Sequence, residues 1–160
     1  NGGSSIGVKK ANNLKELESA LETAFIHDTE VIVEEFIEGR EFSCGILKNN
    51  NDLKVMPLTE IIVNTEFFDY EQKYSENGAT EITPAKLTSQ ESLTCQRIVK
   101  KVFNLLRLKK VARIDFILKN GIFYLIEVNT IPGMSPKSIL PQQAAHLGIS
   151  FDALVNDYLL

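Results

Sequence analysis

The sequence of 160 residues has few cysteines and no long apolar run, and each absence excludes a class of protein. No stretch approaches the roughly 18 consecutive apolar residues of a membrane-spanning helix. No basic segment followed by an apolar stretch is present, so no secretion signal is predicted. The two cysteines, Cys44 and Cys95, form no CxxC pair and lie in patterned segments. They are predicted to be small apolar core residues, which is typical of a reducing compartment.

An excess of positive charge is also missing. Seventeen Lys and Arg against 21 Asp and Glu give a net charge of −4, which argues against broad binding of nucleic acid or anionic membrane. A basic cluster within residues 100–110 remains, but a solvated helix face explains it better than a polyanion site. With 44% hydrophobic and 24% charged residues, the composition is that of a folded globular chain.

Helix signals appear at four places. Asn13 with Glu16 predicts a capped helix to about Ile26, and Thr88 with Glu91 predicts a second that ends near Leu108. Two short helices are expected over residues 138–146 and 151–160.

Strand signals fill much of the remaining sequence. We expect strands over 31–37, 41–48 and 53–63, the last two joined by a reverse turn at 49–52, and a hairpin of 111–118 with 122–128. An antiparallel meander follows from this order. Residues 64–81 are polar and aromatic without a steady period, and a loop of this length predicts a lid.

The hairpin carries more charge than a sheet usually tolerates. Period-two alternation places Arg113 and Asp115 on one face, and Glu127 and Asn129 together on the returning strand. With a three-residue loop centred on Gly121, residue 115 would pair with 127, and 113 with 129. Two carboxylates would then face each other, which destabilises a sheet unless something compensates.

A divalent cation is one compensation. Asp115, Glu127 and Asn129 offer only oxygen ligands, which favours Mg²⁺ or Mn²⁺ with substrate phosphates as further ligands. The alternative is a solvated polar face on which Arg113 neutralises Asp115. The spacing alone leaves both open.

Three loops carry weaker signals. The glycine-rich residues 2–7 could wrap phosphate oxygens, Lys73 and Tyr74 add a cation and a phenol, and Gly133 could present its N–H to an oxyanion. A turn or polar surface loop explains each of them equally well. Because Asn1 leads directly into this loop, we expect the chain to be the carboxyl-terminal part of a longer protein.

Taken in order, these motifs resemble the D-alanine:D-alanine ligase family of the ATP-grasp superfamily. The resemblance covers nearly the whole chain and is carried by residues 3–8, 33–41, 69–74, 112–116, 127–134, 138–141 and 148–151. It implies an α+β ATP-grasp fold, a mainly antiparallel sheet flanked by helices. It also implies an activity, in which ATP phosphorylates one D-alanine and the amine of a second attacks the acyl phosphate.

The resemblance assigns roles to individual residues. Asp115, Glu127 and Asn129 match the magnesium ligands, and Arg113 and the Gly133 N–H match the groups that stabilise the oxyanion. Ser138 matches the residue that holds the carboxylate of the second substrate, and Ile139 stands beside it where Leu is usual. The match of Asp115, Glu127 and Asn129 to magnesium ligands agrees with the cation inferred from their pairing.

The nucleotide contacts are assigned in the same way. The segment that lines the adenosine site corresponds to Glu34, Glu35, Phe36, Ile37 and Glu41, and Lys73 matches a lysine that reaches the ATP phosphates. Ser4 and Tyr74 match a hydrogen-bonded pair that closes the site. Tyr rather than Phe at 74 favours D-alanine over D-lactate as the second substrate.

The resemblance also sets expectations for the whole protein. Residues 1–41 would be the remaining part of the small ATP-grasp subdomain and 42–160 the large one, with the N-terminal domain absent and this piece inactive alone. A cytoplasmic enzyme of peptidoglycan precursor synthesis is implied, in a family that commonly forms dimers. Lys110 departs from a usual Gly. The alternatives are another ATP-grasp carboxylate-amine ligase and a nucleotide-binding module without catalysis.

Overall fold

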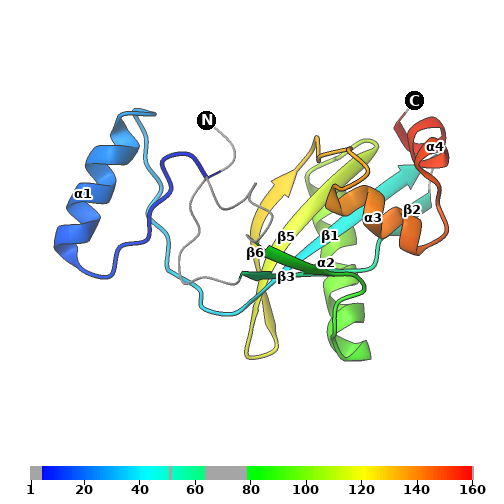
Figure 1. Cartoon of the computed structure of the whole chain (residues 1–160), viewed down its shortest axis with the longest axis horizontal. Helices are drawn as coiled ribbons and strands as arrows, with labels where there is room; N and C mark the ends of the chain where they lie inside the picture. Colours follow the sequence, from blue (N-terminus) through cyan, green and yellow to red (C-terminus); the bar gives the residue numbers. More distant parts are fainter. Residues whose placement is uncertain (1–4, 51, 64–78, 160) are drawn as a thin grey trace. The chain divides into compact units, whose positions relative to one another are not determined.

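The computed structural model describes residues 5–50, 52–63 and 79–159. The chain divides into two compact units, the first comprising residues 1–37 and 63–79 and the second 38–62 and 80–160 (Figure 1). In the described parts of both units, no helix combines the length and apolar character that crossing a membrane requires.

The first unit contains helix α1, Leu14–Phe25. The Asn13 side chain accepts a hydrogen bond from the Glu16 N–H at 3.0 Å, and the Glu16 carboxylate accepts one from the Asn12 N–H at 2.8 Å. The first interaction satisfies an N–H group that the first helical turn leaves without a partner, and the second binds the N–H of the residue before the N-cap. The predicted start of this helix is confirmed, and its end lies one residue before the predicted one.

The predicted strand over 31–37 is wrong for the described chain. Residues 31–38 follow α1 without strand pairing. A strand is defined by ladder hydrogen bonds to a neighbour, and no described segment supplies one here. Residues 31–37 therefore have side chains that favour a strand but make no strand pairing with the described residues.

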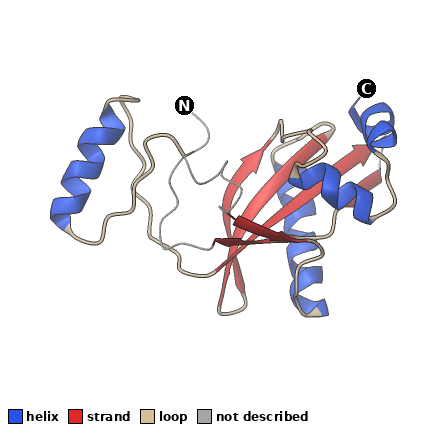
Figure 2. Ribbon diagram, in the orientation of Figure 1, coloured by secondary structure: helices blue, strands red, loops and turns tan. Residues whose placement is uncertain are grey.

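The second unit is built on a sheet with strand order β4-β3-β1-β5-β6, in which β2 also pairs with β1. The pairings of β1 with β2, β3 and β5, and of β5 with β6, are antiparallel. The strands are β1 Arg40–Asn49, β2 Asp52–Val55, β3 Thr59–Val63, β4 Ala79–Ile82, β5 Val111–Lys119 and β6 Ile122–Asn129 (Figure 2).

Three of these strands replace two predictions that were wrong. The single strand expected over 53–63 is divided into β2 and β3, because Pro57 has no N–H to continue the ladder. Residues 79–81, expected to end the lid, belong instead to β4. The rest of the predicted lid lies outside the described residues.

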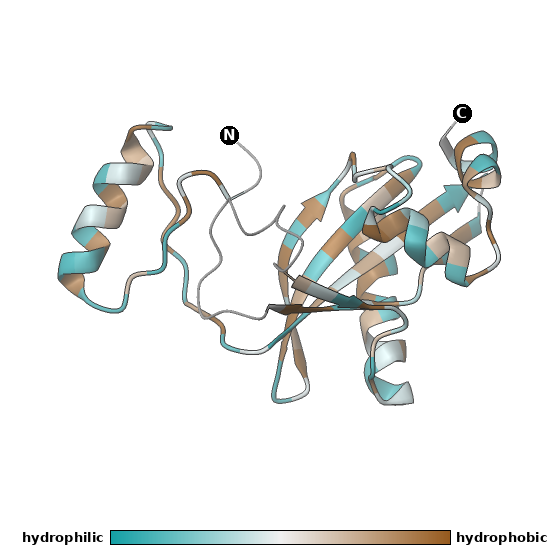
Figure 3. Cartoon of the chain, in the orientation of Figure 1, coloured by the Kyte–Doolittle hydropathy of each residue, from teal (hydrophilic) through white to brown (hydrophobic). Residues whose placement is uncertain are grey.

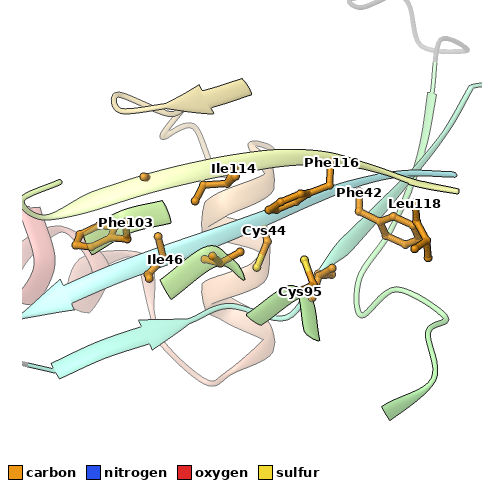
Figure 4. Close-up of a cluster of buried hydrophobic side chains, with 11 residues drawn as sticks. Phe42, Cys44, Ile46, Cys95, Phe103, Ile114, Phe116 and Leu118 are labelled. Atoms are coloured by element: carbon orange, nitrogen blue, oxygen red, sulfur yellow. The ribbon is translucent and has the colours of Figure 1, made fainter. Parts of the chain in front are cut away.

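Helix α2, Ser89–Leu105, covers one face of the sheet. The predicted capping box is confirmed, since the Thr88 Oγ1 accepts from the Glu91 N–H and the Glu91 carboxylate accepts from the Thr88 N–H. The helix ends earlier than predicted, and Arg107 adopts a left-handed φ of 53° soon after its end. Its apolar side packs on alternate residues of β1 and β5 (Figure 4). Figure 3 shows hydrophobic and hydrophilic residues alternating along the strands. Members of this core include Phe42, Cys44, Ile46, Cys95, Val99, Phe103, Ile114 and Phe116.

The other face is covered only in part. Helices α3, Ile139–His146, and α4, Phe151–Leu154, are followed by a π-helical turn, Val155–Leu159. Their apolar residues form a second cluster with β1, made of Leu47, Met56, Leu140, Ala144 and Leu154. The strand residues beyond this cluster form the site described next.

Candidate functional site

The hairpin of β5 and β6 sets the pairing at the site. Asp115 pairs with Glu127 and Arg113 with Asn129, as predicted. The turn itself was predicted wrongly. Lys119 pairs with Ile122, so the loop has only the two residues Asn120 and Gly121, whose φ angles of 53° and 77° suit a primed hairpin turn.

A β-bulge reconciles the shorter turn with the predicted pairing. Phe116 pairs with Leu125, and the register shifts between Asp115 and Phe116, which leaves Ile126 as the extra residue on β6. Without this shift Ile126 would oppose Asp115, and alternation would direct Glu127 to the α2 face. The bulge therefore brings the two carboxylates onto one face.

Asp115 is the centre of the site and is almost buried, at 8% exposure. Its Oδ1 accepts hydrogen bonds from Ser43 Oγ at 2.6 Å and Arg113 Nε at 3.1 Å. Its Oδ2 accepts from Arg113 Nη2 at 2.8 Å and Asn129 Nδ2 at 3.3 Å. The Asn129 amide also donates to Glu127 Oε1 at 2.8 Å, so it bridges the two carboxylates.

Arg113 is the cation of the site. Burial alone would lower its pKa, but the hydrogen bond and charge of Asp115, together with the charges of Glu127 and Glu81, outweigh burial and raise the pKa. The guanidinium is bidentate on Asp115 and lies 3.7 Å from Glu127. The ion pair that the alternative interpretation predicted is thus present, and it holds a fixed positive charge beside the carboxylates.

The residues fit a hard divalent cation. The described parts contain no group of three or more His, Cys, Asp or Glu side chains suited to a metal, so a metal here would depend on two carboxylates and one amide. All three side chains offer oxygen atoms as ligands. The N–H groups of Asn129 and Arg113 point their positive ends at the carboxylates, as a bound cation would place positive charge there. A set this small leaves coordination positions for phosphate oxygens, which is typical of magnesium sites.

A second group of predicted residues lies where α3 begins. Ser138 occupies the N-cap position without capping the helix, and its Oγ accepts from the Ser135 N–H at 3.1 Å. A Cβ at Gly133 would lie 2.9 Å from Ser138 Oγ, so glycine allows this close approach. Ile139 is the first residue of α3. Gly133 and Ser138 are therefore neighbours.

The residues predicted to contact a nucleotide are divided between the two units and the part of the chain outside the described residues. Glu34, Glu35, Phe36 and Ile37 lie in the first unit, where the exposed Phe36 ring has Lys10 Nζ 3.9 Å from its centroid. Glu41 lies in β1 of the second unit. Ser4, Lys73 and Tyr74 lie outside the described residues.

Three residues near the site were missed. Ser43 donates a hydrogen bond to Asp115, and Glu81 raises the pKa of Arg113 and accepts from Gln142 Nε2 at 3.0 Å. Gln143, on α3, is fully buried. Only Ser43 had a sequence signal, since it is a small polar residue within the alternating segment Phe42 to Ile46.

Comparison with known proteins identifies the family. Residues 1–160 match the family model described as the D-ala D-ala ligase C-terminus. A D-alanine–D-alanine ligase of Flavobacterium psychrophilum is 46% identical over 142 residues, which are 89% of this chain and 43% of that protein. One from Leptospira interrogans is 39% identical over 162 residues, 99% of this chain and 46% of its own.

Solved structures agree with the sequence matches. The D-alanine–D-alanine ligase of Bacillus anthracis complexed with ATP superposes with a TM-score of 0.80 at 34% identity, over 96% of this chain and 49% of that one. The VanG D-Ala:D-Ser ligase of Enterococcus faecalis gives 0.85 at 34% identity, over 96% and 45%.

The chain spans about half the length of the relatives that it matches. The expected fold class, an antiparallel sheet flanked by helices as in the ATP-grasp ligases, is confirmed. The chain belongs to the family of the carboxyl-terminal part of D-alanine:D-alanine ligase.

Proposed function

We propose that this chain is the ATP-grasp part of an enzyme that joins two D-alanines through an acyl phosphate at the expense of ATP. The observation that carries the proposal is the Asp115–Glu127 pair with its bridging Asn129 and bidentate Arg113, in a chain of this family. The ATP complex of the Bacillus anthracis relative supports the choice of nucleotide.

In this proposal Asp115, Glu127 and Asn129 would hold Mg²⁺ or Mn²⁺. When bound, the metal neutralises nucleotide phosphates and spreads the charge of phosphoryl transfer. Arg113, held in place by Asp115, presents a fixed cation to negative charge that develops on the substrate. The Gly133 N–H is a second donor for that oxyanion, and Ser138, beside Ile139, orients the carboxylate of the acceptor D-alanine.

The remaining predicted contacts are part of the same proposal. Glu34, Glu35, Phe36, Ile37 and Glu41 would line the adenosine site, and Lys73 would reach the phosphates. Ser4 and Tyr74 would close the site as a hydrogen-bonded pair. The boundary between subdomains at 41 and 42, the cytoplasmic location and a homodimer are proposed on the family resemblance alone.

The acceptor is the part of the proposal that needs a direct test, because one similar structure is a D-Ala:D-Ser ligase. The experiment is phosphate release by the full-length protein with ATP and Mg²⁺, in the presence of D-alanine, of D-alanine with D-serine, and of D-alanine with D-lactate. We expect release with D-alanine alone and a dipeptide product by mass spectrometry. Product formed only with D-serine or D-lactate would assign another acceptor.

A nucleotide titration separates an enzyme from a binding module. Calorimetric binding of ATP to the full-length protein should depend on Mg²⁺, and the Asp115→Asn, Glu127→Gln double variant should lose that dependence. The matched control is Asp52→Asn, at an exposed carboxylate that begins β2. Magnesium-dependent binding without phosphate release under any acceptor would favour the non-catalytic module.

A further inference from the structure

A row of polar side chains crosses the sheet at the site. Thr59 of β3 pairs with Ser43 of β1, Ser43 pairs with Asp115 of β5, and Asp115 pairs with Glu127 of β6. Paired residues of antiparallel strands direct their side chains to the same face. Thr59, Ser43 and Asp115 are buried, whereas the Glu127 side chain is 58% exposed, so the row runs from the interior to the open part of this face.

Gln143 of α3 lies over the buried end of this row and is itself fully buried. Its Nε2 donates to the Ser43 carbonyl and to Thr59 Oγ1, both at 2.9 Å, and its Oε1 accepts from the Gly45 N–H at 2.9 Å. The amide thus uses both donors and its acceptor. In the described residues no buried side-chain nitrogen or oxygen is left without a hydrogen-bond partner.

The two β1 residues that Gln143 binds are neighbours of the proposed catalytic groups. Gly45 pairs with Arg113 across the sheet, and Ser43 pairs with Asp115 and also donates to its carboxylate. Gly45 has no side chain at the point where α3 is closest, and a Cβ there would lie 2.7 Å from Gln143 Oε1. The contact between helix and strand is therefore both close and directional.

The same helix begins at the proposed acceptor site. Ser138 is its N-cap, and Gln143 lies about one and a half turns further along. A helix transmits a displacement along its length as a rigid element. A shift of α3 on β1 would therefore move Ser138, and the Gly133 turn that touches it, relative to Arg113 and Asp115.

We propose that Gln143 is a positioning residue, whose buried amide clamps α3 to Ser43 and Gly45 and so fixes the acceptor site relative to Arg113 and Asp115. The inference rests on the proposed function and goes beyond it. An apolar residue at 143 could fill the same volume, as Leu140 and Ala144 do on the same helix, but it would not fix the helix along the strand. Three directional hydrogen bonds do so.

The experiment is steady-state kinetics of the full-length protein with Gln143→Met, which keeps the length of the side chain and removes its polar atoms. We expect the KM for the acceptor D-alanine to rise roughly 10-fold or more, since small misplacements are costly in a reacting geometry. The KM for ATP should change less than about 2-fold, and so should Mn²⁺ binding with ADP, followed by electron paramagnetic resonance.

Two controls separate positioning from stability. Val99→Ala removes buried volume on the α2 face, and Gln90→Met makes the same chemical change at an exposed glutamine. Both should leave the ratio of the two KM values unchanged. If Gln143→Met lowers activity only in proportion to its folded fraction, as Val99→Ala would, the proposal is overturned.

A milder variant covers the case in which Gln143→Met does not fold. Thr59→Val keeps the shape of the side chain at 59 and removes one partner of the Gln143 amide, together with a hydrogen bond to Thr83 Oγ1. We expect the same selective rise in acceptor KM at a smaller size. An unchanged acceptor KM in Thr59→Val would then overturn the proposal. Wild-type protein that releases no phosphate with D-alanine would instead refute the proposed function, and the positioning role with it.

Discussion

Along β1, the two faces of the sheet in the second unit are buried by different chemistry. The six residues Phe42 to Leu47 of β1 are all buried, and alternate residues face opposite sides. Phe42, Cys44 and Ile46 join the apolar core with α2. Ser43 and Gly45 instead bind the Gln143 amide beneath α3, where Leu47 is the apolar neighbour.

The two faces should differ in which amino-acid substitutions they tolerate. Apolar contacts are not directional, so the α2 face should accept substitutions that conserve volume. Buried polar groups need partners at fixed angles, and removing one leaves another unsatisfied. Stability should therefore depend most on the α2 face, and activity on the α3 face. Four changes test this division.

The largest effect should come from Phe103→Ala on the α2 face. Phe103 is buried between α2 and the sheet, and truncating such a residue costs about 3–5 kcal/mol of unfolding free energy. The sequence has no Trp, so urea unfolding is best followed by circular dichroism. The exposed Leu105→Ala on the same helix is the control, with an expected change below about 0.5 kcal/mol. Equal losses in both variants would contradict the packing described here.

Arg113→Lys should affect activity more than stability. Lysine keeps the charge but cannot bind Asp115 in a bidentate manner, so kcat/KM of the full-length protein should fall ~100-fold. Arg40→Lys is the matched control, because Arg40 makes a similar bidentate pair with Glu60 on the same sheet, at 2.8 and 2.9 Å. Similar losses of kcat/KM in both variants would mean that Arg113 has no special role.

Thr88→Ala should weaken α2 by about 1 kcal/mol through loss of its N-cap. Hydrogen bonds from Thr88 lower the pKa of Glu91, so the ionised carboxylate favours the folded state. This contribution is present above the unfolded pKa of Glu91 and is lost as the pH falls through its lower folded value. Urea unfolding at pH 7 and near pH 3 should therefore give a smaller difference between wild type and variant at pH 3. Thr94→Ala, at a half-buried position inside α2, should lose no stability at either pH.

The smallest expected effect is the reactivity of the two buried thiols, Cys44 and Cys95, in the folded protein. Burial raises the pKa of Cys95 to about 12 and that of Cys44 well above its ordinary value (Figure 4). Because the pKa values are raised, the stability associated with the neutral thiols is complete below the unfolded value and is lost as the pH rises toward the folded one. Iodoacetamide at pH 8 should leave both cysteines unmodified in folded protein and alkylate both in urea, as measured by mass spectrometry. Rapid alkylation of the folded chain would show that this core opens.

The sequence predicted the features that depend on local pattern. The capping pairs at Asn13 and Thr88 and the position of the hairpin at Asn120-Gly121 follow from spacing of a few residues. The pairing of Asp115 with Glu127 was predicted correctly from a turn one residue too long, and the bulge at Ile126 makes up the difference. Pro57 carried a signal too, since a residue without an N–H argues against one continuous strand.

Other features depend on partners that are distant in sequence. Gln143 has the same side chain as its neighbour Gln142, and its partners Ser43 and Gly45 lie about a hundred positions earlier. No local pattern distinguishes the buried glutamine from the partly exposed one. The wrong strand over 31–37 has a related cause, because a strand requires a neighbour that its own sequence does not specify.

The bulge at Ile126 has a consequence for how this hairpin tolerates changes in length. The extra residue on β6 compensates for a turn one residue shorter than the pairing of Asp115 with Glu127 would otherwise need. A homologue that gained one residue at the tip could lose the bulge and keep the same carboxylate pair. The bulge would thereby absorb a one-residue insertion at the turn before it reached the site, and the carboxylate pair would stay fixed.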